Sequence, residues 1–363
     1  MQRLTLLFAG GFLGSGKTTA IAGAAEYLRL NGKKVGVITN DQGVQQVDAR
    51  FMRALGIDTE EVSSGCFCCN YDQLEKSVNL LRENKNPDII FAESVGSCAD
   101  LAATVINPLL TLVPGRYDVI LSVFADIRLL VKFLHGEIDF FAENVSYIYE
   151  KQLDEADIIV ASKIDLLTAD EVINAKKIIS SAFPGKTILY QNSLSRDGII
   201  KWLKACEASK SSDLRQTLNI DYEKYAAGEG ELAWLDEEIG IVSQRSNAVE
   251  SAKLLMHHIY SILKEEEFTI GHLKFLLDNN ITQAKFSYPS IDQTDDADLS
   301  ELQETQRAIM LINARVQTPP EILQRVITDA IVMTEKESDC KIIENNLSVF
   351  RPGIPRPFHR IEV

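Results

Sequence analysis

The stretch GFLGSGKTT, from Gly11 to Thr19, restricts the fold of this chain more than any other. It matches the phosphate-loop pattern, in which a glycine and four residues precede Gly-Lys-Thr. An apolar run leads into it and a helical pattern leaves it, as the motif requires. Its glycines let successive backbone N–H groups curl around an anion, and the next helix presents its positive end. The predicted nucleotide-binding residues here are Gly11, Gly14, Ser15, Gly16, Lys17, Thr18 and Thr19.

Short apolar runs alternate with helical patterns through the first half of the chain. The predicted strands are residues 4–10, 34–40, 88–94, 118–124, 157–163 and 186–192. Continuous apolar strands that alternate with helices indicate a parallel sheet buried on both faces. We therefore predict an α/β fold, namely a P-loop NTPase whose mostly parallel sheet is covered by helices.

The segment ASKID, residues 161–165, ends another predicted strand and bears on the choice of nucleotide. The Asp165 carboxylate can accept hydrogen bonds from guanine N1–H and the 2-amino group, which adenine lacks. Lys163 can lie along the base plane, and Ser162 stands where asparagine is usual. Ser193, after the last predicted strand, lies where a second base-contacting loop would be. A solvated Lys–Asp pair at a strand end is the alternative. Because this segment ends a strand and follows a P-loop in the chain, GTP is favoured as the nucleotide.

Polar residues also follow two other predicted strands. The Glu93 carboxylate can hold Mg²⁺ through water, and the Gly96 N–H can touch a γ-phosphate. Asp41 can orient the attacking water or bind Mg²⁺. Each carboxylate could instead cap a helix or form a salt bridge. We predict Lys17, Asp41 and Glu93 as catalytic residues, with Thr18 and Glu93 at the Mg²⁺ ion.

The strand–helix rhythm stops near residue 205, and 363 residues are enough for two domains. We predict a P-loop GTPase domain over residues 1–206, a polar linker over 207–231 and a smaller α+β domain over 232–363. In the last of these, Thr318 is the expected N-cap of a helix. An acidic surface loop is expected at residues 290–304.

Cys66, Cys68 and Cys69 lie within the four residues 66–69, although the chain has only six cysteines. Thiolates are soft ligands that suit Zn²⁺, Co²⁺ and Ni²⁺. A closed structural zinc site needs four ligands, often as two spaced pairs, and no second pair lies nearby. Three thiols with an open fourth position suit a metal carrier. Buried thiols are the alternative for this triplet, and Cys98 is either a fourth ligand or a small buried hydrophobe.

Together these motifs resemble the CobW/HypB/UreG family of metallochaperone GTPases, in particular its CobW-like branch. The resemblance rests on the P-loop, GCFCC (65–69), Glu93 to Gly96, SKID (162–165) and Asn40 to Gly43. It covers roughly residues 3–205 and implies slow GTP hydrolysis coupled to delivery of a metal ion or metal cofactor. Asp41 and Gln42 depart from the usual residues, no histidine-rich run is present, and Cys98 lies outside the general pattern.

Composition limits the partners. The net charge of −15 argues against broad nucleic-acid binding and against an anionic membrane surface. We find neither an export signal nor an apolar run long enough to span a membrane, so we expect a cytoplasmic protein with reduced thiols. The resemblance implies a metal-requiring client protein as partner and allows a homodimer.

The sequence therefore predicts a GTP-hydrolysing metallochaperone that uses GTP, Mg²⁺ and a transition metal, either Zn²⁺, Co²⁺ or Ni²⁺. Two alternatives come from other classes. One is an ATP-dependent kinase or partition-type ATPase, in which Asp165 makes no base contact. The other is a non-enzymatic adaptor that bound zinc merely stabilises.

Overall fold

The computed structural model of the chain describes residues 3–41, 43, 47–63, 65–137, 142–289 and 302–363. Most of the acidic loop expected at residues 290–304 therefore lies outside the described part. The chain forms two compact units. The first contains residues 1–42, 55–228 and 354–363, and the second contains residues 43–54 and 229–353. The boundaries at residues 206 and 231 remain a prediction.

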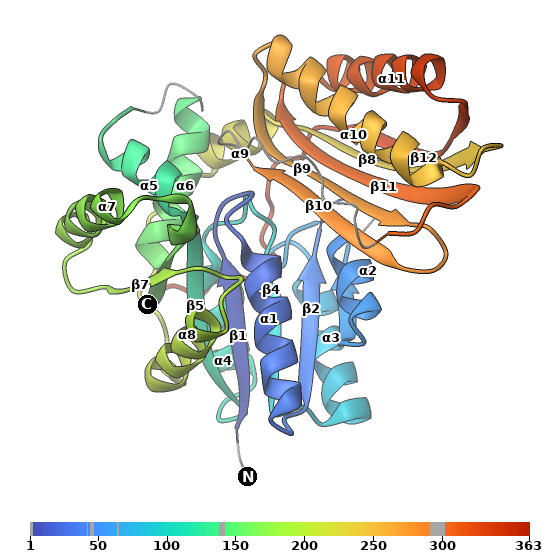
Figure 1. The fold of residues 1–363 in the computed structure, drawn as a ribbon. Coiled ribbons are helices and arrows are strands. Elements are labelled where there is room, and N and C mark those ends of the chain that lie inside the picture. The colour runs from blue at the N-terminus through green and yellow to red at the C-terminus, as the bar shows by residue number, and fades with distance from the viewer. Residues whose placement is uncertain (1–2, 42, 44–46, 64, 138–141, 290–301) are drawn as a thin grey trace. The chain divides into compact units, whose positions relative to one another are not determined.

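The first unit is built on a seven-stranded sheet in the order β3-β2-β4-β1-β5-β6-β7 (Figure 1), and every neighbouring pair is parallel. Its strands are β1 (Leu4–Gly10), β2 (Val35–Asn40), β3 (Asp58–Val62), β4 (Ile89–Glu93), β5 (Tyr117–Asp126), β6 (Ile158–Ser162) and β7 (Thr187–Gln191). This arrangement confirms the predicted parallel sheet and all six predicted strands. The sequence does not predict β3, because this edge strand, DTEEV, is mostly polar.

Helices cover both faces of this sheet. Figure 1 shows α1 and α8 in front of it and α4 behind it. The helices of the first unit are α1 (Lys17–Leu30), α3 (Tyr71–Lys85), the π-helix η1 (Ala102–Ile106), α4 (Asn107–Leu112), α5 (Ile127–Leu134), α6 (Glu143–Glu155), the 3₁₀ turn η2 (Ile164–Leu166), α7 (Ala169–Ala182), α8 (Arg196–Ser209) and α9 (Tyr222–Gly230), whose last two residues fall in the second unit. No helix in the described part of the chain combines the length and apolar character that crossing a bilayer demands.

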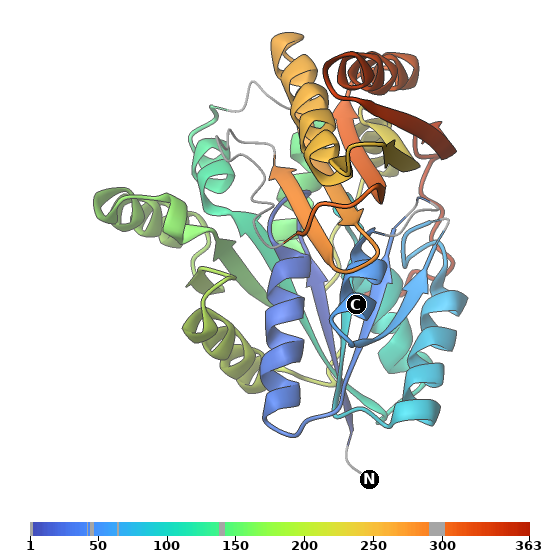
Figure 2. The same cartoon turned by 45° about the vertical axis from the view of Figure 1, so that its right-hand side comes forward.

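The second unit contains a five-stranded antiparallel sheet in the order β10-β9-β11-β8-β12. Its elements are α2 (Val47–Ala54), β8 (Ala233–Ser243), α10 (Ala248–Glu265), β9 (Thr269–Asp278), β10 (Gln283–Pro289), β11 (Arg307–Gln317), α11 (Pro320–Glu337) and β12 (Cys340–Phe350). Helices α10 and α11 lie side by side against it (Figure 1 and Figure 2). This unit is the predicted α+β domain. The N-cap of α11 is Pro319, so the prediction of Thr318 as its N-cap is wrong.

Helix α2 belongs to the second unit although it follows β2 in the chain. Val47 and Phe51 on α2 pack against Leu276 and Leu311 of the sheet. The Asp48 carboxylate also accepts hydrogen bonds from Lys274 Nζ at 2.7 Å and Lys285 Nζ at 2.6 Å. Burial alone would raise the pKa of Asp48, but the two ammonium groups hold it well below its usual value. A partly buried charge cluster thus holds α2 against the sheet of the second unit.

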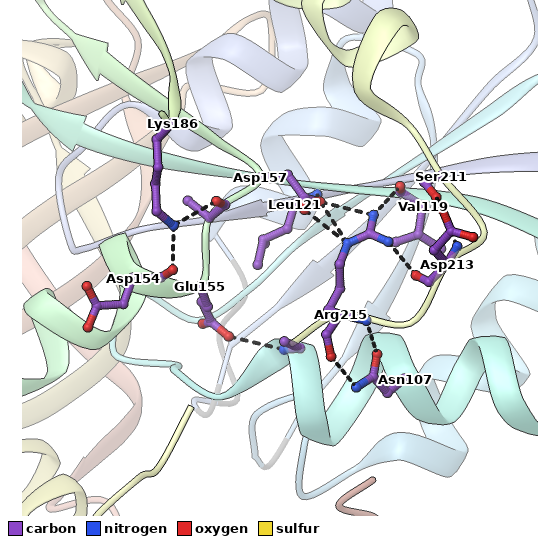
Figure 3. Close-up of polar contacts among 12 residues, drawn as sticks. Asn107, Val119, Leu121, Asp154, Glu155, Asp157, Lys186, Ser211, Asp213 and Arg215 are labelled. Carbon is purple, nitrogen blue, oxygen red and sulfur yellow. Dashed lines mark hydrogen bonds and ion pairs between the residues drawn. The ribbon is translucent and has the colours of Figure 1, made fainter. Parts of the chain in front are cut away.

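A polar network holds the chain after α8 to the first unit (Figure 3). The Arg215 guanidinium donates to both carboxylate oxygens of Asp157 at 3.0–3.2 Å and to the Val119 carbonyl at 2.8 Å. The Asn107 side chain exchanges two hydrogen bonds with the Arg215 backbone, at 2.7 and 2.9 Å. The pair is partly buried, so removing one partner would leave the other with fewer hydrogen bonds in a site that water reaches only in part. The polar stretch from residue 207 is therefore a fixed part of this unit up to residue 228.

Glu155, at the end of α6, is a buried carboxyl group in the same region (Figure 3). Its Oε2 accepts a hydrogen bond from the Ala102 N–H at 3.1 Å. Burial raises the pKa of Glu155 from 4.5 to about 8. The folded protein therefore keeps this carboxyl protonated at neutral pH, because a charge there would lose its hydration.

We expect Glu155→Gln to flatten the pH dependence of stability. The folded pKa lies above the unfolded value, so wild-type stability is highest below pH 4.5 and declines up to about pH 8. The slope contributed by one proton is about 1.4 kcal/mol per pH unit. Urea unfolding across this range should show the variant gaining stability over the wild type as pH rises. Glu150→Gln, on the exposed face of α6, should show the same pH dependence of unfolding free energy as the wild type. The same pH dependence in Glu155→Gln would contradict this account.

Candidate nucleotide and metal site

The phosphate loop joins β1 to α1, as the sequence predicts. Gly16 is the N-cap of α1 with a φ of 89°, in the left-handed region that favours glycine. Gly11 has a φ of 116°, and a Cβ there would lie 2.1 Å from the Phe124 carbonyl oxygen. No larger residue fits that position, because the neighbouring strand's backbone occupies the space. The loop geometry therefore depends on these two glycines.

The side chains of the phosphate loop are buried where phosphates would bind. Lys17 Nζ donates hydrogen bonds to the Gly11 carbonyl at 2.6 Å and the Phe12 carbonyl at 3.1 Å. Ser15 is 1% exposed, and among the described residues its hydroxyl has no hydrogen-bond partner. A phosphate oxygen would satisfy such a hydroxyl. Gly14 and Thr19 lie in the same loop and first helical turn.

Thr18 and Glu93 meet beside this loop. The Thr18 hydroxyl donates to Glu93 Oε1 at 2.8 Å, and both side chains are buried. A hydroxyl and a carboxylate at this distance are oxygen ligands of the kind Mg²⁺ prefers, so the pair fits the predicted ion. Asp41 is partly buried at the end of β2, and its N–H donates to the Val62 carbonyl at 3.3 Å. The neighbouring Gln42 lies outside the described residues.

Gly96 lies close to the phosphate loop. A Cβ added at Gly96 would lie 2.5 Å from the Leu13 side chain and 3.1 Å from the Leu13 backbone nitrogen. The loop after β4 and the phosphate loop therefore touch at this glycine. This contact places the predicted γ-phosphate sensor beside the predicted phosphate site.

The segment expected to contact the base follows β6. The Ser162 hydroxyl donates to the Ser15 carbonyl at 2.7 Å and to the Ala125 carbonyl at 3.0 Å, so it ties this strand to the phosphate loop. Lys163 has a φ of 63° and an ion pair with Asp126 at 3.1 Å. Asp165 is exposed in the 3₁₀ turn.

Ser193 also lies beside the phosphate loop. Its hydroxyl would be 3.7 Å from a Cβ added at Gly16. All predicted nucleotide residues thus come from the carboxyl edge of one parallel sheet, where ligands of such sheets usually bind.

The cysteine triplet forms one turn after β3. The Cys66 carbonyl accepts hydrogen bonds from the N–H groups of Cys69 at 3.0 Å and Asn70 at 2.9 Å, so the thiols converge. The Sγ atom of Cys69 is 3.4 Å from that of Cys66 and 3.7 Å from that of Cys68. Zinc–sulfur bonds of about 2.3 Å in a tetrahedron place sulfurs about 3.8 Å apart. The triplet is therefore already close to the spacing that a metal requires.

Protonation of the triplet follows from its surroundings. Hydrogen bonds with Cys66 and Cys69, together with burial, raise the pKa of Cys68 well above its usual value. For Cys69, the hydrogen bond with Cys66 and burial also raise the pKa. For Cys66, hydrogen bonds with Cys68 and Cys69 lower the pKa, but the Cys98 contact and burial outweigh them and raise it. A bound metal would have to displace these protons.

The Asn40 side chain holds the cysteine turn in place. Its Nδ2 donates to the Val62 carbonyl at 3.0 Å and the Gly65 carbonyl at 2.7 Å, and its Oδ1 accepts from the Phe67 N–H at 2.9 Å. Phe67 is fully buried and packs edge-on against Phe8 of β1. The sequence marks Asn40 only as the first residue of a loop motif and does not indicate this role. Ser64, between these contacts, lies outside the described residues.

The segment Ile354–Val363, which we call the strap, lies over the cysteine turn within the first unit. The Arg356 N–H donates to Cys69 Sγ at 3.2 Å, and the Phe358 N–H donates to the Cys68 carbonyl at 2.8 Å. Further along, the Arg360 guanidinium bonds Asp100 at 2.9 Å. The prolines of the strap indicate extended chain but give no sign of where it binds. Sequence reasoning missed this element for that reason.

Comparison with known proteins gives the following. The family model of the CobW/HypB/UreG nucleotide-binding domain matches residues 5–190. Zinc chaperone CobW of Sinorhizobium sp is 29% identical over 192 residues, covering 47% of this chain and 54% of that protein. Zinc chaperone YeiR of Escherichia coli strain K12 is 32% identical over 167 residues, covering 44% and 46% respectively. The chain thus spans about half the length of these curated relatives. Among solved structures, HypB from Archaeoglobus fulgidus has a TM-score of 0.41 and 19% identity, covering 56% of this chain and 89% of HypB.

We expect Asn40→Ala to expose the cysteine turn. The substitution leaves the buried Phe67 N–H and the Gly65 carbonyl without their partner, at a cost of about 1–3 kcal/mol each. Alkylation of Cys66 and Cys68 by iodoacetamide, followed by peptide mass spectrometry on metal-free protein, should accelerate at least about tenfold. Asn31→Ala, which removes only an exposed bond to the Tyr27 carbonyl on α1, serves as the control. Unchanged rates in Asn40→Ala would show that this side chain does not hold the turn.

Proposed function

The chain belongs to the CobW/HypB/UreG family, and from that premise we propose that it is a GTP-hydrolysing metallochaperone whose cysteine turn carries a divalent metal ion to a client protein. One observation carries the proposal. The three thiols of Cys66, Cys68 and Cys69 converge within 4.8 Å of one another, beside a complete phosphate loop. Zn²⁺ is the first choice of cargo, because thiolates suit it and two relatives are named zinc chaperones, while Co²⁺ and Ni²⁺ suit the same ligands.

The residues of the phosphate loop would bind and orient GTP. Lys17 would turn from the loop carbonyls to the β- and γ-phosphates, and backbone N–H groups would hold the remaining oxygens. Thr18 and Glu93 would hold Mg²⁺, which neutralises charge that develops on the phosphates. Asp41, which follows β2, would orient the attacking water. These side chains supply positioning and electrostatics, and a low intrinsic rate of hydrolysis fits a carrier that waits for its client.

Coupling between nucleotide and metal would pass through the end of β2. Asn40 bonds the cysteine turn, and Asp41 follows directly. A γ-phosphate that orders the Asp41 loop would therefore act on the residue that shapes the metal site. Hydrolysis would relax the same loop and release the cargo to the client. We place this exchange in the cytoplasm, where thiols remain reduced, and a homodimer is compatible with it.

Guanine selectivity should depend on Asp165. We expect Asp165→Ala to weaken GTP binding by about 100-fold, because two hydrogen bonds to a charged acceptor are lost. Inosine triphosphate lacks the 2-amino group, so its affinity should fall less than that of GTP in this variant. The affinity for ATP should not change. Isothermal titration with the three nucleotides measures this, with Asp170→Ala in α7 as the control. Equal binding of ATP and GTP by the wild type would instead favour the kinase or partition-type ATPase.

The metallochaperone proposal itself is tested by linkage. GTP and Zn²⁺ must change each other's affinity by the same factor, because binding free energies are reciprocal. Zn²⁺ should be titrated with and without a non-hydrolysable GTP analogue, and the analogue with and without Zn²⁺. The two changes in dissociation constant should be the same factor, and this factor should differ from one. A Cys66/Cys68/Cys69→Ser variant should lose Zn²⁺ binding and keep GTP binding, whereas Cys340→Ser should keep both. Absence of coupling, with unfolding on chelation and no GTP turnover, would identify a zinc-stabilised adaptor.

A further inference from the structure

The strap places a hydrogen-bond donor on one of the candidate metal ligands. The Arg356 N–H donates to the Cys69 Sγ at 3.2 Å, and the Phe358 N–H donates to the Cys68 carbonyl at 2.8 Å. Both donors are main-chain groups, so these contacts depend on where the backbone of the strap lies rather than on its side chains. Whatever positions the strap therefore also positions the donor to the Cys69 sulfur.

The strap is anchored at Asp100, in the loop after β4. Arg360 Nε donates to Asp100 Oδ2 at 2.9 Å, and Arg360 Nη2 donates to the Leu218 carbonyl at 2.8 Å. The Asp100 side chain is only 1% exposed, and the Tyr222 hydroxyl donates to the same Oδ2 at 2.7 Å. Burial raises the pKa of Asp100, and the contacts of Tyr222 and Arg360 oppose this rise. Loss of Arg360 would leave a buried carboxylate without its cation.

Two further contacts hold the strap along the same path. The His359 ring lies edge-on to the ring of Tyr71, the first residue of α3, with centroids 4.9 Å apart. The Ile361 N–H donates to the Ala103 carbonyl at 2.8 Å, and the Ile361 carbonyl accepts from Asn107 Nδ2 at 3.1 Å. The strap thus bridges the cysteine turn and α3 on one side and the start of η1 and α4 on the other.

The anchor belongs to the loop that carries the predicted γ-phosphate sensor. Asp100 follows Gly96 in the same loop, before η1 begins. The buried Gln152 amide on α6 donates to the carbonyls of both Gly96 and Cys98 at 2.9 Å, so one side chain holds successive parts of this loop. A displacement of the loop at Gly96 would therefore reach the anchor of the strap.

We propose that Arg360 and Asp100 are positioning residues of the metal site, because their ion pair anchors the strap and thereby holds the Arg356 N–H on the Cys69 sulfur. This inference rests on the proposed metal-carrier function and deepens it. An N–H that bonds a ligand sulfur fixes the orientation of that sulfur, and outer contacts of this kind tune metal affinity. Loosening the anchor would weaken the site and speed release of the cargo.

The first test uses metal-free protein. Arg360→Ala should accelerate alkylation of Cys69 by iodoacetamide at least about tenfold, because loss of a hydrogen bond between charged groups favours the detached strap. Arg360→Lys, which keeps a cation for Asp100, should restore most of the wild-type rate. Glu362→Gln removes only the exposed contact of Arg360 and should match the wild type. The wild-type rate in Arg360→Ala would overturn the proposal, and so would an equal acceleration at the buried Cys206, which reports on global unfolding.

The main-chain donor can also be removed directly. Arg356→Pro deletes the N–H, and the flanking Pro355 and Pro357 already restrict this chain to extended conformations that proline allows. We expect Arg356→Pro to release Zn²⁺ to excess chelator about tenfold faster than the wild type. The sulfur-to-Co²⁺ charge-transfer band should move to lower energy, because the sulfur loses a donor. Arg356→Ala keeps the N–H and should match the wild type in both readouts. Identical behaviour of the two variants would overturn the proposal.

The link to the nucleotide loop has its own readout. A non-hydrolysable GTP analogue should change the rate of Zn²⁺ release by a smaller factor in Arg360→Ala than in the wild type, because the strap is no longer tied to Asp100. An equal factor in both proteins would overturn this link.

Failure of the carrier function gives a different result. If the wild type binds neither Zn²⁺ nor Co²⁺, the proposed function fails and this inference fails with it. If the wild type binds Zn²⁺ and Arg356→Pro releases it at the wild-type rate, only this inference fails.

Discussion

The parallel order of the first sheet is the constraint on which the candidate site depends. In such a sheet every strand ends at the same edge, so the loops after β1, β2, β3 and β4 are neighbours although β1 ends at Gly10 and β4 only at Glu93. The phosphate loop follows β1, Asp41 follows β2, the cysteine turn follows β3, and Glu93 is the last residue of β4. Hydrogen bonds join these neighbouring segments. Thr18 bonds Glu93, and Asn40 bonds the cysteine turn. The first connection requires β1 and β4 to run in the same direction, and the second requires the same of β2 and β3.

Polar groups near η1 stabilise the sheet and the segments packed on it. The Asp157 carboxylate binds the Arg215 guanidinium and also accepts the Leu121 N–H at 2.8 Å, so a single side chain fixes both β5 and the segment after α8. The Glu155 carboxyl performs a similar role for the start of η1. Displacing the partly buried Asp157–Arg215 pair or the buried Glu155 carboxyl would leave polar groups without their partners, so these contacts favour the observed arrangement.

Periodicity and motif spacing were sufficient to predict the first sheet, because its strands are apolar runs bounded by turns. Periodicity and spacing did not predict elements that are not marked by apolar runs. Strand β3 is polar and exposed at the sheet edge, and α11 starts one residue later than Thr318 suggests because Pro319 takes the N-cap position. The phosphate loop, the SKID segment and the cysteine triplet were visible because their chemistry depends on residue type and local spacing.

Contacts between residues that are far apart in the sequence leave no local pattern of residue type or spacing. Asn40 is one of many asparagines at strand ends, and nothing local indicates that its amide binds a turn more than 20 residues away. The strap approaches the same turn from residues 354–363, almost 300 residues further along the chain. The sequence therefore identified the candidate metal ligands of the turn but not the residues that enclose them.

The enclosure of the cysteine turn bears on how a cargo could leave it. Cys66 is 2% exposed and Cys68 is 1% exposed, and the strap bonds the Cys68 carbonyl and the Cys69 sulfur. Thiols already spaced for a metal lose little conformational freedom on binding, which favours high affinity. High affinity and burial together make spontaneous release slow. Under the proposed function, a carrier with this site needs a source of free energy to open it, and the end of β2, where Asn40 bonds the turn, is where nucleotide binding could act on it.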